Sequence, residues 1–194
     1  MKTSTLKKRL LLQGNNAGFS LVEVLVVVAI IAVLAAMSTS GLSYLIRGNI
    51  KKAVKTMHSA IATSRTDSMS RSGKWELRIS GGPSIGSDSQ TDPYVVTNGY
   101  TDATGTSFVA EDEYQFDPMM TSIRLWDADG NLKGYLTNIQ FEKSTGAVKS
   151  VTSTETTIAK DSNPGYVDIE IIVNDNSRKI RLYYITGQME YIYD

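Results

Sequence analysis

The acidic side chain of Glu23 lies in the segment QGNNAGFSLVEVLVVVAIIAVLAAM, near the start of an apolar run. From Phe19 to Met37 the run is apolar except for Ser20 and Glu23, and in an α-helix it approaches the hydrocarbon thickness of about 30 Å. An acid in such a helix costs about 2.5 to 3.5 kcal/mol at the centre and less near an end. In lipid the carboxylate takes up a proton or seeks a cation. The chemistry that Glu23 offers is therefore ion pairing in an apolar environment.

The chain lacks the residue types from which catalytic sites are usually built. The chain has no cysteine, which excludes disulfides and thiolate sites, and one histidine, His58, so no Ser-His-Asp or Cys-His set can form away from it. No glycine-rich phosphate loop follows a predicted strand. We expect no enzyme activity and no cofactor, and His58 is predicted to be an ordinary surface or interface residue.

A calcium site is considered at Asp127-Ala128-Asp129-Gly130-Asn131, because alternating acids present oxygens to a hard cation. An EF-hand loop requires glycine at its sixth position and glutamate at its twelfth, where Leu132 and Asn138 stand. Asp-Gly is typical of tight hairpin turns, so a turn is favoured over a metal site at Asp127 and Asp129. The acids Glu111, Asp112, Glu113 and Asp117 are predicted to form a solvated loop.

The composition fits one apolar segment and one globular domain. The chain has 194 residues, with 20 basic and 20 acidic side chains. Residues 1–18 contain four basic side chains and no acid, so the remainder has a net charge of −4. A mildly acidic protein is a poor candidate for broad nucleic-acid binding, which requires clustered cations.

Three interpretations of the apolar run compete. A secretory signal peptide would use the small-x-small site at Ala36-Met37-Ser38, but Glu23, the length of the run and the polar QGNNAG before it are atypical. A plain single-pass anchor would tolerate an acid near its end. The third interpretation is a signal cut on the cytoplasmic side of the run.

The motif GFSLVE at Gly18 to Glu23 follows a short basic leader and precedes an uninterrupted apolar helix. It resembles the prepilin signal of type IV pilins and type II secretion pseudopilins. The resemblance implies that a prepilin peptidase cuts between Gly18 and Phe19 and that Phe19 is then N-methylated. It also implies that Glu23 pairs with the freed amine of Phe19 on an adjacent subunit and sets the axial stagger of the filament.

The resemblance divides the chain into a leader (1–18), a transmembrane assembly helix (19–41), an amphipathic continuation (42–72) and a β-rich domain (73–194). It places the leader in the cytoplasm and the C-terminal domain outside the cytoplasmic membrane, with a cell-surface filament after assembly. The implied partners are other pilin or pseudopilin subunits, the peptidase, a membrane assembly platform and the lipid bilayer.

The second part of the helix is predicted from apolar residues at helical spacing, namely Leu42, Leu45, Ile50, Val54, Met57, Ile61 and Ala62. We expect a nearly continuous helix from Phe19 to about Ser70, with Gly73 as its C-terminal cap. Ser40 stands where many relatives have a proline, which puts the usual kink in doubt. Five cations and no acid lie between Leu42 and Thr66, namely Arg47, Lys51, Lys52, Lys55 and Arg65. They are predicted to form a solvated face beside lipid headgroups.

Two-residue alternation begins after Gly73 and predicts strands in KWELRIS, EYQFD, SIRLWD, YLTNIQFEK, YVDIEIIV, RKIRLYYI and MEYIYD. Residues 81–105 are predicted to be an irregular loop around the short piece Tyr94-Val95-Val96. A long helix followed by antiparallel hairpins implies an α+β fold in which the sheet packs against the helix.

The segments NIQFEKSTGAV and IRLYYITGQMEY, with glycine turns at Phe141 to Gly146 and Ile185 to Gly187, are similar to H-type minor pseudopilins and FimT-like minor pilins. The resemblances imply a minor structural subunit of a type IV pilus or type II secretion-like filament. The alternative is a pilin-anchored binding module for DNA uptake or adhesion, with residues 81–105 and 152–163 as its recognition segments. Secretion, adhesion, motility and competence filaments share the same N-terminal signal, so the sequence does not separate them.

Overall fold

The computed structural model describes residues 20–81, 93–102, 107–116, 120–162 and 164–192, and for residues 36–47 and 120–121 it describes the main chain alone. The chain forms two compact units, Met1–Leu42 and Ser43–Asp194. Helix α1 (Leu21–Ser70) passes from the first unit into the second without a break at Ser40 or Gly48. The expectation of a continuous helix ending near Ser70 is therefore confirmed.

The start of α1 is capped by a side chain. The amide of Glu23 donates to Oγ of Ser20 at 3.2 Å and to its carbonyl oxygen at 3.0 Å. Ser20 and Glu23 are thus at the N-cap and N3 positions of a capping-box sequence, S-x-x-E. At the other end Gly73, with φ of +107°, lies three residues beyond the last helical residue and places the chain against Tyr100 as β1 begins.

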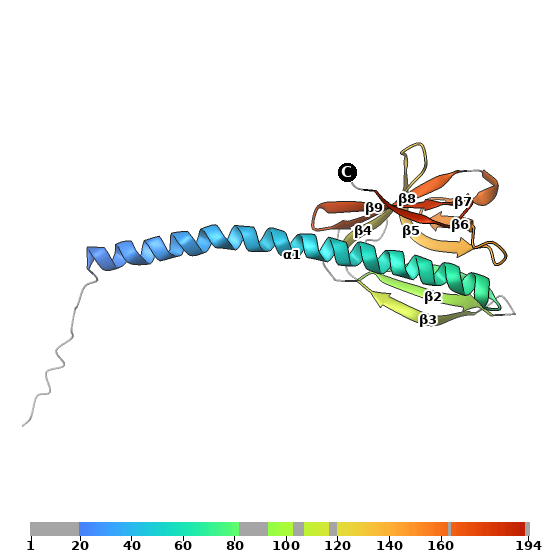
Figure 1. Ribbon diagram of the computed structural model, residues 1–194, viewed down its shortest axis with the longest axis horizontal. Coiled ribbons are helices and arrows are strands. Elements are labelled where there is room, and N and C mark those ends of the chain that lie inside the picture. The colour runs from blue at the N-terminus through green and yellow to red at the C-terminus, as the bar shows by residue number, and fades with distance from the viewer. Residues whose placement is uncertain (1–19, 82–92, 103–106, 117–119, 163, 193–194) are drawn as a thin grey trace, which may run out of the picture. The chain divides into compact units, whose positions relative to one another are not determined.

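The second unit consists of α1 and a ten-stranded sheet whose pairings among the described residues are all antiparallel (Figure 1). The strands are β1 (Lys74–Ser80), β2 (Val95–Thr101), β3 (Phe108–Gln115), β4 (Met120–Trp126), β5 (Leu132–Phe141), β6 (Val148–Ser153), β7 (Thr157–Ala159), β8 (Tyr166–Val173), β9 (Asn176–Tyr183) and β10 (Met189–Ile192), with a 3₁₀ turn, η1 (Lys160–Ser162), before β8. Their order is β10-β9-β8-β4-β5-β1-β2-β3, and β6 pairs with β5 and β7. The predicted α+β fold is confirmed.

One face of α1 forms the core with the sheet. Ile50, Val54, Met57 and Ile61 are buried as predicted. Ala62 is partly exposed, and the buried stripe passes instead through Ala53, Ala60 and Ser64. The side chains of Leu42 and Leu45 lie outside the described residues.

The sheet supplies alternate residues to the same core, as a strand with one covered face must. Those that are buried include Leu77, Ile79, Ile123, Leu125, Ile169, Ile171, Ile180 and Leu182. Burying each such side chain contributes about 1.5 to 3 kcal/mol to the stability of the second unit.

Four strands differ from the sequence expectation. Strand β2 extends through Thr101, so residues 95–101 are sheet and not irregular loop. Strand β3 begins at Phe108, five residues before the predicted EYQFD segment, and β6 and β7 were not expected at all. Strand β6 has two apolar residues among six, and β7 is only three residues long, so neither gave the run of two-residue alternation on which the prediction depended.

The Asn98-Gly99 pair explains why β2 was missed. Asn-Gly commonly marks a turn, yet here it forms a bulge in the pairing of β2 with β3. The buried amide of Asn98 donates to Oδ2 of Asp67 at 2.7 Å, which ties the strand to α1. A Cβ at position 99 would lie 2.2 Å from the carbonyl oxygen of Val109, so only glycine fits there.

On the sheet face opposite α1, Glu76 is buried within a set of hydrogen-bond donors. Oε2 accepts from Asn138 at 2.9 Å and from Gln140 at 2.8 Å, and Oε1 accepts from Nε of Arg78 at 2.7 Å and from Thr101 at 3.3 Å. Burial alone would raise the pKa of Glu76, but the hydrogen bonds from Asn138, Gln140 and Arg78 outweigh it and hold the pKa below the ordinary 4.5. The ionised carboxylate therefore joins β1, β2 and β5.

Glu76→Gln is expected to lower the free energy of unfolding by about 1.5 to 3 kcal/mol at pH 7, the range for hydrogen bonds to a charged group. Because the folded pKa is depressed, this contribution is present above pH 4.5 and is lost as the pH falls through the folded pKa. Urea denaturation of the full chain in detergent, followed by the fluorescence of Trp75 and Trp126, measures it. The exposed Glu155→Gln is the control, and equal stability of wild type and Glu76→Gln at pH 7 would contradict the assignment.

Candidate assembly site

Glu23 lies in the first turn of α1, where the partial positive charge of the helix N-terminus favours an acid. This local role was missed in the sequence, although S-x-x-E before an apolar run was a visible signal. Gly18 and Phe19, the predicted processing residues, lie outside the described residues.

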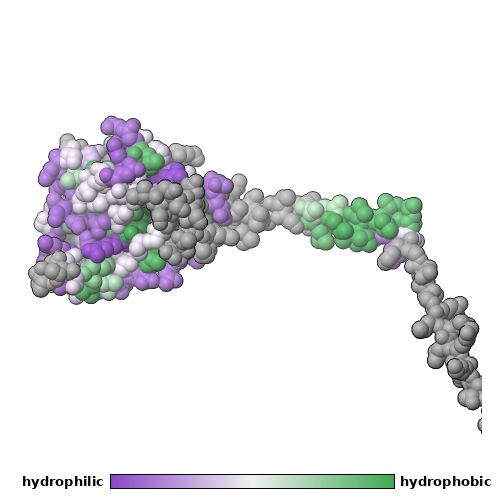
Figure 2. Space-filling model, turned by 180° about the vertical axis from the view of Figure 1, so that it is seen from behind, coloured by the Kyte–Doolittle hydropathy of each residue, from purple (hydrophilic) through white to green (hydrophobic). Residues whose placement is uncertain are grey.

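The residues that follow Glu23 are apolar and exposed. From Leu21 to Leu34 the large hydrophobic side chains are between 49% and 77% exposed, and Figure 2 shows them as a hydrophobic stretch on the face in view. Exposed apolar surface of this extent needs a cover, either lipid or other protein. It is the part of the described chain with the strongest physical requirement for a partner.

Within the residues that the structure describes, no helix combines the length and the apolar character that crossing a bilayer requires.

The helix cations do not form a single solvated face. Lys51, Lys52 and Lys55 are exposed as expected, and the side chain of Arg47 lies outside the described residues. Arg65, however, donates from Nε to the carbonyl oxygen of Gly146 at 3.0 Å and from Nη2 to that of Thr186 at 2.8 Å. The prediction of a solvated role for Arg65 is therefore wrong, because two turn carbonyls replace its water.

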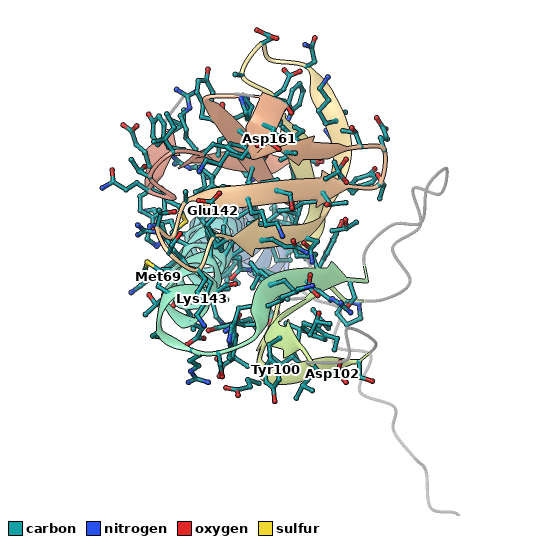
Figure 3. All side chains as sticks on the ribbon, turned by 90° about the vertical axis from the view of Figure 1, so that its right-hand side faces the viewer. Met69, Tyr100, Asp102, Glu142, Lys143 and Asp161 are labelled. Atoms are coloured by element: carbon teal, nitrogen blue, oxygen red, sulfur yellow. The ribbon has the colours of Figure 1, made fainter. Side chains whose placement is uncertain are left out.

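Arg65 joins the two glycine turns that were noted in the sequence. Gly146 in the β5–β6 turn and Gly187 in the β9–β10 turn have φ of +66° and +63°. A Cβ at Gly187 would lie 2.0 Å from the carbonyl oxygen of Gly146, so the turns are in direct contact. Figure 3 shows Met69 of α1 beside the β5–β6 turn, which carries Glu142 and Lys143.

His58 packs against the last strand. Its ring stacks on Tyr191 with centroids 5.0 Å apart and an interplanar angle of 26°. Burial lowers the pKa of His58, so the imidazole is neutral at pH 7. This is a packing contact between α1 and β10.

The Asp127 segment forms the hairpin turn between β4 and β5, as predicted. Oδ1 of Asp127 accepts from the amides of Asp129 at 3.1 Å and Asn131 at 2.7 Å, and Gly130 has φ of +80°. Desolvation would raise the pKa of the Asp127 carboxyl, but hydrogen bonds from Lys133 and Asn131 and the charge of Lys133 lower it to about 2. Among the residues with described side chains, no group of three or more histidines and acids is placed to hold a metal ion.

The acids Glu111, Asp112 and Glu113 are exposed, but they lie in strand β3 and not in a loop. The correction follows from the pairing of β3 with β2, which leaves β3 at the edge of the sheet. Glu111 forms an ion pair with Arg71 at the end of α1. Asp117 lies outside the described residues.

The segments expected to recognise a ligand are only partly described. Within residues 81–105, positions 82–92 and 103–106 lie outside the described residues, and the rest contains β2. Residues 152–162 form the end of β6, β7 and η1. Most of the described part of these segments is therefore strand or 3₁₀ turn, and residues 154–156 form the link between β6 and β7.

Comparison with known proteins agrees with the N-terminal features. Residues 13–39 match the family model of the prokaryotic N-terminal methylation motif. The chain is also similar to the crystal structure of the type IV minor pilin FimU from Pseudomonas aeruginosa (strain PAO1), at 9% identity and a TM-score of 0.44, covering 76% of this chain and 90% of that one. No curated protein matches the chain.

Residues 13–39 carry the methylation motif, and α1 continues from them into a unit with an antiparallel sheet, which is the α+β fold expected from the resemblance. The N-terminal segment of the chain is similar to that of type IV pilin-like proteins.

Arg65→Met is expected to destabilise the second unit by about 1 to 3 kcal/mol, because the carbonyls of Gly146 and Thr186 lose a charged donor while the side-chain volume is retained. Chemical denaturation of the full chain in detergent measures the change. The exposed Lys52→Met is the matched control and should change stability by less than about 0.5 kcal/mol. A similar effect of the two substitutions would show that the turns do not depend on Arg65.

Proposed function

We propose that this chain is a minor structural subunit of a type IV pilus or type II secretion-like filament, processed between Gly18 and Phe19 and assembled through its N-terminal helix. The observation that carries the proposal is the methylation motif at residues 13–39, which is continuous with exposed apolar residues of α1. In a soluble monomer this apolar surface would face water, whereas in a subunit that moves from lipid into a bundle of helices it stays covered.

The energetics favour this path. Covering each large apolar side chain contributes about 1.5 to 3 kcal/mol, so residues 19–41 enter the bilayer first and later pack against the same segments of neighbouring subunits. In both environments the carboxylate of Glu23 is unfavourable, because an ionised acid is costly to place among apolar groups. A methylated amine at Phe19 of a neighbour supplies the counter-charge, and the pairing fixes how far one subunit is displaced along the filament.

The proposal assigns roles to each part of the chain. Residues 1–18 form a cytoplasmic leader removed by a prepilin peptidase, 19–41 form the membrane and assembly helix, 42–72 continue the helix, and 73–194 form the outer domain. The assembly platform extracts the processed subunit from the cytoplasmic membrane, and the filament then carries the outer domain to the cell surface.

Processing is tested first at the N-terminus. Mass spectrometry of the protein isolated from membranes of a host with a prepilin peptidase should find a chain that begins at Phe19 and carries one additional methyl group. Gly18→Val should leave residues 1–18 attached, because the bulky residue disturbs the cleavage site. A mature chain that begins at any other residue would refute the assignment.

The role of Glu23 is tested by separating its charge from its helix-capping position. Glu23→Gln retains a residue that suits the N3 position of a capping box, so membrane insertion should persist, while filament assembly should fall by about tenfold or more. The reason is that removing one member of a buried charge pair costs about 2 to 5 kcal/mol. Quantification of sheared filaments against membrane-bound chain measures it.

Ser20→Ala is the matched control, because it removes the capping oxygen and keeps the carboxylate. It should assemble nearly as well as the wild type. The ion-pair role would be refuted if Glu23→Gln assembled as much filament as the wild type, or if both variants lost the same amount.

A further inference from the structure

A cleft of about 480 Å³ lies at the C-terminal end of α1, between the start of β1 and the β5–β6 turn. Figure 3 faces this end of the domain and shows Lys143 on that turn. The volume is within the range of about 300 to 1,000 Å³ that is usual for the sites of small molecules. We refer to this surface as the lysine cleft, after Lys74, Lys143 and Lys149, which line it.

The three lysines of the cleft are exposed and come from different elements. Lys74 is the first residue of β1, Lys143 lies in the β5–β6 turn and Lys149 is the second residue of β6. Within the part of the chain that the structure describes, none of the three forms an ion pair or a side-chain hydrogen bond. A cleft lined by cations concentrates the electric field and attracts anions, so the ligand that fits here is negatively charged.

Glu142 is the one acid among the described residues that line the cleft, and its charge is already balanced. Its Oε2 accepts from Nζ of Lys160 at 2.9 Å and from Oγ1 of Thr145 at 2.9 Å. These hydrogen bonds, with the charges of Lys160 and Lys149, hold the pKa of Glu142 below the ordinary 4.5. Because Lys160 does not line the cleft, the three lysines that do still give it a positive charge.

Between the lysines the cleft has polar groups that suit sugar hydroxyls. Nε2 of Gln140 donates to Oε2 of Glu76 at 2.8 Å, which fixes the amide and leaves its carbonyl oxygen as an acceptor. The hydroxyl of Ser144 is exposed and can both donate and accept. Trp75 and Phe141 are buried beneath these groups and close the floor of the cleft. A short saccharide that carries carboxylates matches both the charge and the hydrogen-bonding groups of this lining.

A nucleic acid matches the cleft less well. Sites for single strands offer aromatic faces on which bases stack, whereas Trp75 is 4% exposed and its ring lies 5.2 Å from that of Tyr100. Duplex binding requires more phosphate contacts than three lysines supply. The guanidinium of Arg71, which lies 5.0 Å from the Trp75 ring, is already paired with Asp67 and Glu111.

We propose that the lysine cleft binds a short acidic saccharide outside the cell. Carboxylates on the sugar rings pair with the three ammonium groups, and sugar hydroxyls form hydrogen bonds with Gln140 and Ser144. The inference goes beyond the proposed function and uses it only for the outer position of the domain. A subunit with this site attaches the filament that carries it to an anionic surface polysaccharide.

The test measures the affinity of the full chain in a non-ionic detergent for immobilised oligogalacturonate by biolayer interferometry. Binding is expected at low salt and should weaken as the salt concentration rises, because the ammonium groups are exposed to solvent. A neutral maltooligosaccharide of the same length should not bind. Absence of oligogalacturonate binding at low salt, or equal binding of the two saccharides, would overturn the proposal.

Substitution of the lysines identifies the site. Lys74→Gln, Lys143→Gln and Lys149→Gln should each lower the affinity about two- to fivefold, the effect of one solvent-exposed ion pair. The triple variant should lower it about tenfold or more. Since the three side chains are exposed, the variants should remain folded, which urea denaturation checks.

The matched control removes the same number of charges elsewhere. Lys51, Lys52 and Lys55 are exposed lysines of α1 that do not line the lysine cleft. Their combined replacement by Gln should leave the affinity within about twofold of the wild type, because exposed charges separated by more than a Debye length are largely screened. An equal loss in the two triple variants would indicate a general charge effect and overturn the proposal.

Competition with duplex DNA separates the two kinds of polyanion. Free oligogalacturonate should displace the chain from the immobilised saccharide at a lower concentration of charge than duplex DNA does. The reverse order would identify a nucleic-acid site and overturn the proposal.

The results also separate this site from the proposed function. If only the saccharide site is wrong, binding is absent while Phe19 is still the methylated first residue and Glu23→Gln still impairs assembly. If the filament role is wrong, those two results fail while the lysine-dependent binding persists.

Discussion

The packing of one face of α1 on the sheet is the constraint on which the rest of the second unit depends. Ile50, Val54, Met57 and Ile61 occupy that face, and it is covered by alternate residues of several strands. Once this stripe is buried, helical geometry determines where every other residue of the segment lies. Lys51 and Lys55 must then border β9 and β10, and Lys52 must border the end of β3.

The same helix meets two different requirements along its length. From Leu21 to Leu34 its large apolar residues are exposed and need a cover from outside the chain, whereas from Ile50 to Ile61 the buried apolar residues are covered by the sheet. Glu23 lies at the start of the exposed segment, and the cations Lys51, Lys52 and Lys55 lie at the start of the segment that packs on the sheet. A division of this kind lets one element serve both assembly and domain stability without a conflict between them.

The parts of the structure that were predicted from the sequence are those in which apolar periodicity is strong. The amphipathic stretch of α1, β1, β8 and β9 and the Asp127 turn all have clear local patterns. The failures have other causes: Asn98-Gly99 forms a bulge and not a turn, with Asn98 bonded to the distant carboxylate of Asp67, and β6 has only two apolar residues yet is paired on both sides. Arg65 was misplaced because its partners are main-chain carbonyls 81 and 121 residues away, which no sequence pattern marks. For the assembly site, the motif assigned roles to Gly18, Phe19 and Glu23, and these roles stay predictions, while the capping of α1 by Ser20 was overlooked.

The side chain of Arg65 has a mechanical consequence. It fastens α1 to two hairpin loops whose strands, β5, β6, β9 and β10, are distributed across the sheet. Tension applied along the helix therefore reaches several strands at once, instead of peeling them away one at a time from an edge. Because one guanidinium donates hydrogen bonds to both loops, a force applied to the helix is shared between two hairpins.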